Sequence, residues 1–300
     1  MPGPKGATLI DAGASNGVTA HLKKSMARKL SFGFFFAMSL TGFIASSSHI
    51  SANPASWALD RTISTVSLNI AKETDPNEVV KAIRNAPRLH DADLYLLQEV
   101  RHEEGKPSVA DEAARKLGYS ASFAPAAPGV YDQGLAIVSR YPIMDVQIKR
   151  LKSCDLRFRS RNRFALSATV QTPWGDLRVW NVHLDTRINP QERLAQLQPV
   201  IDDAARHSGP RLIGGDFNTN DLYWVGNVLP LPFGPPHGTA LRGAMKQHGF
   251  ETPFPNALDT FPPFRRHLDW IFLNELKCLG SSVEPASFSD HNAIWVRTQL

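Results

Sequence analysis

The segment of residues 211–220, RLIGGDFNTN, most constrains how this chain can fold. Its apolar pair Leu212–Ile213 indicates the end of a buried strand, and the pair Gly214–Gly215 indicates a tight turn or a close approach of another backbone. Asp216 and Asn218 follow two residues apart, so in an extended chain both side chains point to the same side. A carboxylate and a carboxamide in that arrangement can bind a hard cation and donate to an anion, although both residue types are also ordinary turn formers after glycine.

Polar residues also stand at the ends of other predicted strands, where an apolar interior would not select them. Taken singly, each has a structural explanation: Glu99 as a salt-bridge partner, His183 as a hydrogen-bonded core histidine, Asp290 as a turn cap. A shared site explains them together. Its predicted members are Asn69, Glu99, His183, Asp185, Asp216, Asn218, Asp269, Asp290 and His291.

Short strands alternate with helices along the chain, which predicts one α/β domain with its site along one edge of the sheets. The predicted strands are Ile63–Ile70, Leu94–Val100, Gly134–Ser139, Phe164–Val170, Leu177–Leu184, Leu268–Leu273 and Ala293–Val296. The predicted helices are Pro76–Asn85, Ala110–Leu117 and Pro190–Arg206. Residues 221–263 are rich in Pro, Gly and aromatic residues, so we expect a long functional loop there with one helix near Leu241–His248.

The net charge of +5 does not by itself indicate a nucleic-acid substrate. Residues 1–52 contain five of the 33 Lys and Arg residues and one of the 28 acids, which leaves residues 53–300 with a net charge of +1. The basic character of the chain therefore belongs mostly to its N-terminal segment, and the rest is nearly neutral.

That N-terminal segment has the pattern of a targeting signal. Four basic residues between Lys23 and Lys29 precede the uncharged apolar run Leu30–Ile44, which is followed by small polar residues. This order is typical of a secretory signal, with an uncleaved signal anchor as the alternative. We therefore divide the chain into an N-terminal extension, 1–52, and a catalytic domain, 53–300, and expect export to the periplasm or the exterior. For Cys154 and Cys278 we expect two buried free thiols rather than a disulfide.

The order of the polar motifs resembles that of the endonuclease/exonuclease/phosphatase superfamily. The resemblance covers about residues 57–300 and rests on Asn69 in SLNI, Glu99 in LLQEV, His183 in NVHLD, Asp216 and Asn218 in GGDFN, Asp269 in LDWIF, and Asp290 with His291 in SDH. It implies a four-layer α/β sandwich, with two mixed sheets face to face and helices outside. A His in the NVHLD motif is more similar to the deoxyribonuclease and sphingomyelinase branches than to the abasic-site endonucleases.

The resemblance also implies roles for these residues. Asn69 and Glu99, with Asp290 at a second metal position or in the water network, would hold Mg²⁺ (or Mn²⁺), because their ligand atoms are oxygens. His291, oriented by Asp269, would take the proton from the attacking water. Asp216 would position that water, Asn218 would donate to the phosphoryl oxygens, and His183 would act on the leaving side.

The substrate class stays open at this stage. Arg157, Arg159, Arg161 and Arg163 alternate in the sequence and could contact phosphates, or could be a solvated strand face or loop. The aromatic residues of the long loop could stack on bases, insert into a lipid interface or pack on the sandwich. We expect a phosphate-ester substrate (nucleic acid, phospholipid or small phosphodiester), no obligate protein partner and a monomer. A catalytically silent binding module is the alternative, and the complete set of motif residues argues against it.

Overall fold

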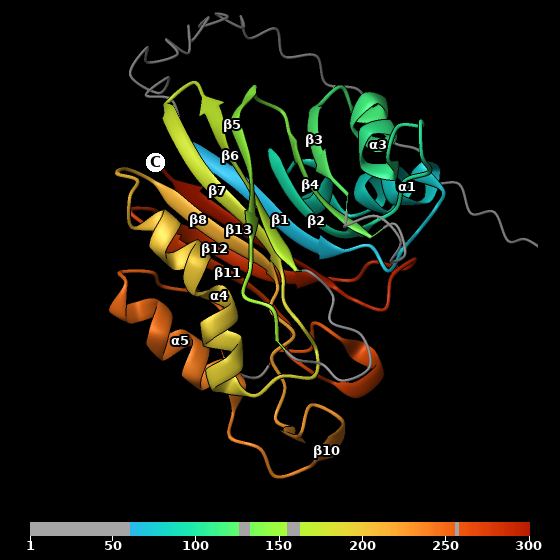
Figure 1. Cartoon of the computed structure of the whole chain (residues 1–300). Helices are drawn as coiled ribbons and strands as arrows, with labels where there is room; N and C mark the ends of the chain where they lie inside the picture. The colour runs from blue at the N-terminus through green and yellow to red at the C-terminus, as the bar shows by residue number, and fades with distance from the viewer. Residues whose placement is uncertain (1–60, 126–132, 155–162, 256–257) are drawn as a thin grey trace, which may run out of the picture. The chain divides into compact units, whose positions relative to one another are not determined.

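Two β-sheets pack face to face in this computed structural model, which describes residues 61–300 except 126–132, 155–162 and 256–257 (Figure 1). In spatial order the first sheet contains β12 (Lys277–Glu284), β13 (Ala293–Gln299), β1 (Thr62–Asn69), β2 (Leu94–Val100), β4 (Gly134–Ser139) and β3 (Ser120–Ala124). The second contains β11 (Asp269–Asn274), β8 (Arg211–Asp216), β7 (Gly175–His183), β6 (Phe164–Thr172) and β5 (Ile143–Arg150). Both sheets are mixed, because β1 and β2 are parallel, as are β7 and β8, and their other neighbours are antiparallel.

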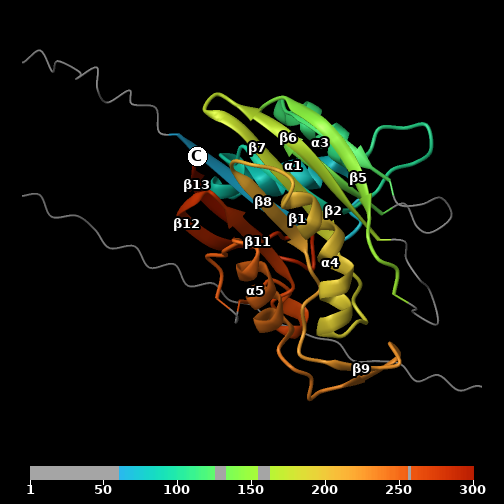
Figure 2. The same cartoon turned by 60° about the vertical axis from the view of Figure 1, so that its left-hand side comes forward.

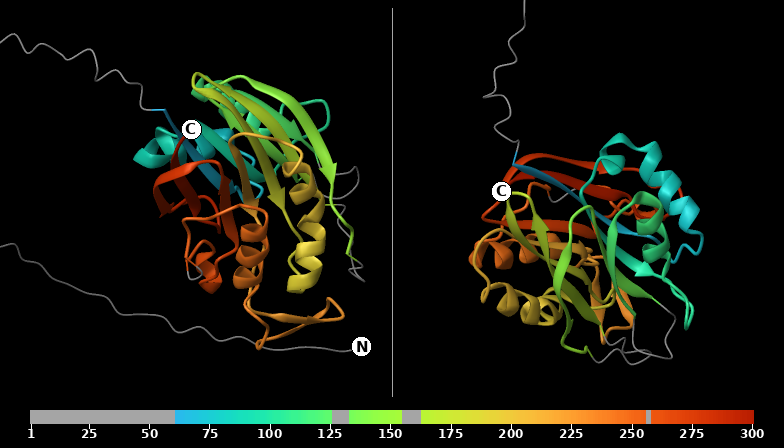
Figure 3. Two further views of the ribbon diagram at one scale, coloured as in Figure 1. Left: turned by 90° about the vertical axis from the view of Figure 1, so that its left-hand side faces the viewer. Right: turned by 90° about the horizontal axis from the view of Figure 1, so that it is seen from above.

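Helices cover the outer face of each sheet, which confirms the predicted four-layer sandwich (Figure 3). The helices α1 (Pro76–Asn85), α2 (Pro87–His90) and α3 (Val109–Leu117) share an apolar cluster with the first sheet. The helices α4 (Pro190–Ala204) and α5 (His237–Gln247) pack on the second sheet (Figure 2). The remaining elements are the hairpin strands β9 (Tyr223–Val225) and β10 (Leu229–Leu231) and the short 3₁₀ helix η2 (Pro262–Phe264).

The residue pattern of β2 shows why the strands occupy the middle of the sandwich. Leu94 and Leu96 belong to the apolar cluster between the sheets, whereas Tyr95 and Leu97 belong to the cluster under α1 and α3. Alternate side chains of a strand point to opposite faces, so an uninterrupted apolar run is stable only when both faces are covered. Each such fully buried side chain stabilises the fold by roughly 1.5–3 kcal/mol.

The helix boundaries follow from local capping. In α1, the Asp75 side chain accepts a hydrogen bond from the Asn77 N–H, and Pro76 occupies the first turn. In α3, Ser108 and Asp111 form a reciprocal capping box, and Gly118 ends the helix in the left-handed region.

The glycine pair before Asp216 is required by the packing of β8. Gly215 has φ +145°, and a Cβ there would lie 2.0 Å from the carbonyl oxygen of Val182 on β7. A Cβ on Gly214 would lie 2.8 Å from the Leu96 side chain of the facing sheet. The predicted close approach is therefore confirmed, and it involves both a neighbouring strand and the opposite sheet.

The predictions about the two cysteines can be compared with the structure, whereas those about the N-terminal segment cannot. Cys154 and Cys278 are both free, and Cys154 is buried as expected whereas Cys278 is half-buried. Residues 1–60 lie outside the described part of the chain, so the two-part domain division and export stay predictions. In the described part of the chain, no helix has the length and apolar character needed to cross a membrane.

Candidate active site

The polar strand ends predicted from the sequence meet in one cleft of about 510 Å³ between the two sheets. The predicted residues that line it are Asn69, Glu99, Arg163, His183, Asp185, Asp216, Asn218, Asp290 and His291. Asp269 does not line the cleft but is fully buried behind it, in contact with His291. The structure therefore brings together every predicted site residue that it describes.

Strand register explains how the second sheet contributes three of these residues. His183 ends β7 and lies directly opposite Asp216, which ends the parallel strand β8. Asp269 begins the antiparallel strand β11 and also lies opposite Asp216. One row of the sheet thus holds all three side chains, and Asp216 is in the centre.

Asp216 receives hydrogen bonds on both carboxylate oxygens. The Asn69 side-chain amide donates to Oδ2 at 3.1 Å from the facing sheet, and the Asn218 backbone N–H donates to Oδ1 at 2.8 Å. Two imidazole nitrogens also approach Oδ2: Nε2 of His183 at 3.5 Å and Nε2 of His291 at 3.9 Å. The carboxylate is only 1% exposed and is therefore held in one orientation.

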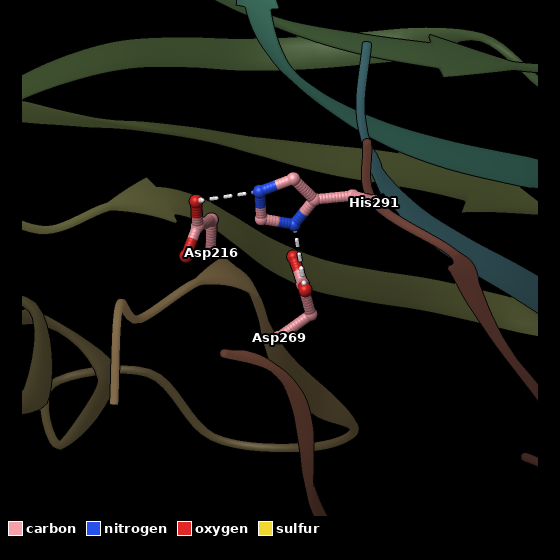
Figure 4. Close-up of side chains that lie close together, drawn as sticks. All are labelled: Asp216, Asp269 and His291. Carbon is pink, nitrogen blue, oxygen red and sulfur yellow. Dashed lines mark hydrogen bonds and ion pairs between the residues drawn. The ribbon is translucent and has the colours of Figure 1, made fainter. Parts of the chain in front are cut away.

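His291 lies between two carboxylates (Figure 4). Its Nδ1 is 2.9 Å from Oδ2 of Asp269, and its Nε2 faces Asp216. The loop before β13 is fixed because the Ser289 hydroxyl donates to the Asn69 carbonyl at 2.6 Å and accepts from the His291 N–H at 3.0 Å. The ring of Phe261 covers the imidazole at a centroid distance of 4.9 Å. A histidine held this way on Nδ1 presents Nε2 to the cleft, as a general base requires.

Burial and neighbouring charges shift the pKa values of this group. Burial, followed by the nearby Asp269 carboxylate, raises the pKa of Asp216 to about 7. Burial alone would lower the pKa of His291, but the carboxylates of Asp269 and Asp216 outweigh it and raise that pKa to about 10. The free protein therefore favours an imidazolium between the two carboxylates.

Glu99 reaches the cleft through an irregular point in β2. The pairing of β2 with β4 is interrupted between Leu97 and Val100, and Glu99 has φ +57°. Such left-handed geometry costs about 1 kcal/mol or more in a non-glycine residue and is common where a side chain is re-aimed at a site. The Lys72 ammonium lies 3.1 Å from its carboxylate.

Lys72 also lines the cleft, although no sequence pattern indicated it. It follows Ala71 in a turn closed by a hydrogen bond from the Glu73 N–H to the Ile70 carbonyl at 2.9 Å. Both central residues of this turn are left-handed, with φ +48° for Ala71 and +65° for Lys72, positions that favour Asn and Gly. Nothing in the sequence "AKE" signals such a turn, so only the structure could reveal the Lys72–Glu99 pair.

The donor set at the cleft suits a hard divalent cation. The carboxylates of Glu99 and Asp290 and the amide oxygen of Asn69 are oxygen ligands, and no Cys lines the cleft among the described residues. A separate group, Asp216, Asp269 and His291, has ligand atoms within 4.8 Å of one another. One buried oxygen of Asp269, Oδ1, has no hydrogen-bond partner in the described part of the chain. The residues present therefore fit a metal ion, with Glu99 now paired to an ammonium where a cation would bind.

The predicted arginine stripe is only partly described. Arg157, Arg159 and Arg161 lie outside the described residues. Arg163 lines the cleft, but its Nε lies 3.0 Å from Oδ1 of Asp185, so it is engaged in a buried ion pair.

Two further buried residues, missed from the sequence, support the loops of the site. Arg193 on α4 donates to the carbonyls of Asp185, Phe217 and Ile188 at 2.8, 2.5 and 3.1 Å, and burial lowers its pKa to about 10. Gln196 donates to the Asp185 carboxylate at 2.8 Å. From the sequence, both residues would be assigned to the exposed polar face of an amphipathic helix. No local pattern distinguishes a buried arginine that donates to carbonyls from an exposed one.

Comparisons with known proteins agree with this architecture. The chain is similar to the structure of an endonuclease/exonuclease/phosphatase from Beutenbergia cavernae, with 19% identity over 80% of this chain and 72% of that chain and a TM-score of 0.63. It is similar to a Bacteroides vulgatus endonuclease/exonuclease/phosphatase, with 15% identity over 80% and 99% of the two chains and a TM-score of 0.60. The catalytic domain of human Nocturnin, solved with a bound sulfate anion, matches with 18% identity over 79% and 93% and a TM-score of 0.55. At these identities the likeness shows the fold alone.

A search of curated protein sequences found no match. The sequence profile of the Endonuclease/Exonuclease/phosphatase family, however, matches residues 66–291, which span every predicted catalytic and metal-binding residue. Members of this family are phosphoester hydrolases and generally depend on a divalent metal. The chain therefore belongs to the endonuclease/exonuclease/phosphatase family and is a hydrolase of phosphate esters.

Proposed function

We propose that this protein is an exported phosphodiesterase that requires Mg²⁺ or Mn²⁺ and cleaves its substrate by attack of a water molecule. The observation that supports this most is the convergence on Asp216 of Asn69, Asn218, His183 and His291, from both sheets, in one cleft. Export is supported by the basic and apolar pattern of residues 23–44.

The residues of the cleft divide into two functional groups. Asp216 orients the attacking water through a carboxylate oxygen, and Nε2 of His291 accepts the proton that the water loses. The carboxylate of Asp269 keeps the imidazole oriented and stabilises its charged form. On the other side, Asn218 and His183 donate to phosphoryl oxygens and to the leaving oxygen.

Glu99 and Asn69, with Asp290 close by, would hold the cation. When bound, a divalent cation neutralises charge on the phosphoryl oxygen as the transition state develops. His183 supports assignment to the deoxyribonuclease and sphingomyelinase-like branch, since that position is Tyr in the abasic-site endonucleases.

A substrate panel tests this function. Plasmid DNA, RNA, sphingomyelin, phosphoinositides and a soluble bis-aryl phosphodiester are each incubated with Mg²⁺, Mn²⁺ or EDTA. We expect turnover of at least one diester that stops in EDTA. Asp216→Ala and His291→Ala should each lower it by at least about 10³-fold, because water positioning and proton transfer act together. Undiminished turnover in excess EDTA would contradict the metal requirement, and no turnover of any diester would favour a binding module.

A further inference from the structure

An exposed apolar hairpin stands beside the cleft. The run of residues 222–236, LYWVGNVLPLPFGPP, contains no charged residue and includes β9 and β10, which pair only with each other. Six of its apolar side chains are exposed, from 39% for Leu231 to 90% for Phe233, and the others are Tyr223, Val225, Val228 and Leu229. Figures 1, 2 and 3 show the hairpin projecting away from the two sheets. Exposed apolar surface of this kind marks an interaction site.

Polar contacts hold the hairpin in this position. The Asn189 side chain, at the start of α4, donates to the Trp224 carbonyl at 2.9 Å and accepts from the Trp224 N–H at 2.8 Å. The Asn227 side chain donates to the Arg187 carbonyl at 2.8 Å, and the Gly234 N–H donates to the Asp221 carbonyl at 2.9 Å. A two-stranded hairpin is only marginally stable alone, so these bonds fix it to the domain with its apolar side chains in solvent.

The apolar surface begins at the rim of the cleft. Leu222 and Trp224 line the cleft together with Phe264, which is 69% exposed. Arg187 and Arg266 also line the cleft, and the Arg266 guanidinium lies over the Phe264 ring, 5.8 Å from its centroid. A group held at the hairpin would therefore be next to Asp216 and His291.

The charges around the cleft indicate which partner this surface fits. A long nucleic acid is held by many phosphate contacts along its length, but of the four Lys and Arg side chains that line the cleft in the described part of the chain, Lys72 and Arg163 are ion-paired with Glu99 and Asp185, which leaves Arg187 and Arg266. A phospholipid interface instead presents phosphates above an apolar layer. Aromatic and aliphatic side chains enter such a layer, while arginines at the rim contact the phosphates.

We propose that the hairpin of residues 222–236 inserts into a phospholipid surface and brings the cleft to the headgroup phosphodiester. This inference rests on the proposed function for its chemistry, and it adds the substrate class: a diester presented at a lipid interface. Docking itself needs no turnover and can be measured separately.

The test is binding of the full chain to vesicles in EDTA, where hydrolysis is prevented. Vesicles of phosphatidylcholine, with or without phosphatidylglycerol, are made with brominated acyl chains that quench tryptophan fluorescence. The quenching that Trp224→Phe abolishes reports contact of this hairpin with lipid, separately from any contact through the apolar run Leu30–Ile44. We expect Trp224 to be quenched, more so with phosphatidylglycerol.

The double variant Leu229→Ser, Phe233→Ser should lower the lipid partition coefficient by at least about tenfold, since two inserted side chains are lost. Neither residue lines the cleft, and both are exposed, so hydrolysis of a soluble diester should stay at the wild-type rate. The matched control is Ile148→Ser on β5, which removes a side chain that is 58% exposed, close to the 57% of Leu229.

Three outcomes would overturn the docking proposal: an unquenched Trp224, equal loss of binding in Ile148→Ser, or a concentration-dependent dimer that the double variant abolishes. In those cases the soluble diester is still hydrolysed, so the proposed function stands. Vesicle binding by a protein that hydrolyses no diester would instead contradict the proposed function and leave docking supported.

Discussion

Asp216 and His291 share a buried position in which neither side chain has its ordinary acidity. Asp216 is removed from water and lies beside Asp269, so its pKa is raised to about 7. His291 faces both carboxylates, so its protonated form is favoured. For His291 to accept a proton from water it must first be neutral, and raising the pH supplies that form.

We therefore expect kcat/KM on a soluble diester to rise with pH until the pH reaches the His291 pKa of about 10. Asp269→Asn removes the strongest of the interactions that raise the His291 pKa, so the rising limb should move to lower pH while the maximum rate falls. Asp290→Asn, which removes a weaker contribution, should move it less. Profiles for the three proteins at saturating metal are the measurement, and an unmoved limb in Asp269→Asn would mean that His291 is not the titrating base.

Lys72 should compete with a divalent cation, because its ammonium lies where the cation would neutralise Glu99. Lys72→Met keeps an unbranched side chain that is one atom shorter and removes the charge, so Mg²⁺ should bind about five to ten times more tightly. Glu99→Gln should weaken binding. Isothermal titration without substrate measures both, and Lys106→Met is the control, since its partner Glu103 is in an exposed pair away from the cleft. Unchanged or weaker binding in Lys72→Met would show that the ammonium does not compete with the metal.

At the scale of elements, the sequence best predicted the strands that are buried on both faces and the helices that have one buried and one exposed face. The ranges of α1, β2 and β4 are as predicted, because doubly buried strands and a capped amphipathic helix leave a local pattern. The strands β3, β5 and β12 were not predicted. In β5 the apolar residues Met144, Val146 and Ile148 alternate with polar ones, so its sequence does carry a strand pattern. It differs from a core strand because these apolar side chains are exposed on an edge strand whose pairing is interrupted between Met144 and Gln147.

The segment 221–263 shows a different limit. The expected helix exists but begins earlier, at His237 instead of Leu241, and the hairpin β9–β10 was missed. Its fixing contacts come from Asn189 and from the backbone of Arg187, more than thirty residues away in sequence, and no local pattern reports them. Of the aromatic residues in this segment, Phe254 is only 2% exposed whereas Phe233 is 90% exposed, and composition alone cannot predict that difference.

The first residue of α5 gives a prediction about stability. Burial, and then the charge of Arg193, lower the pKa of His237 to about 4 from an ordinary value of 6.5. A helix N-terminus also disfavours a positive charge. Between these pH values the unfolded chain binds the extra proton, so this residue's contribution to stability is complete above pH 6.5 and is lost as the pH falls towards 4.

The expected loss is at most about 3 kcal/mol of unfolding free energy. His237→Met should flatten the fall in melting temperature over that range, whereas His248→Gln, at the exposed end of the same helix, should not. Thermal unfolding followed by circular dichroism at a series of pH values is the measurement. An identical slope in His237→Met and wild type would exclude this residue as the cause.

At the scale of the whole domain, a polar contact crosses the apolar interface between the two sheets. The Asn181 side chain on β7 donates to the carbonyls of Leu97 and Ala136 at 2.8 and 2.9 Å, and its oxygen accepts from Gln98 at 2.7 Å. All three partners belong to the first sheet, and Leu97 is where β2 becomes irregular before Glu99. No motif or periodicity predicts such a contact, because it depends on how two sheets face each other.

Asn181→Leu should lower the unfolding free energy by about 3 kcal/mol, since buried carbonyls lose their donors, and the melting temperature by about 6 to 12 °C. Thr65→Val is the control: its hydroxyl is buried without a hydrogen-bond partner in the described part of the chain, so its removal should cost little. Equal stability of the two variants, measured by denaturant unfolding, would show that the contact between the sheets contributes nothing.

The same contact restricts how the two sheets can be aligned. Apolar side chains between sheets tolerate small displacements, since one methyl group can replace another as a neighbour. Asn181 and Gln98 tolerate none, because a slip of one residue would leave two amides and two carbonyls unbonded in an interior without water. Misaligned packings of this chain are therefore much less stable than the native one. Since Asn69 and Asp216 come from opposite sheets, the alignment that satisfies the interior is also the one that assembles the cleft.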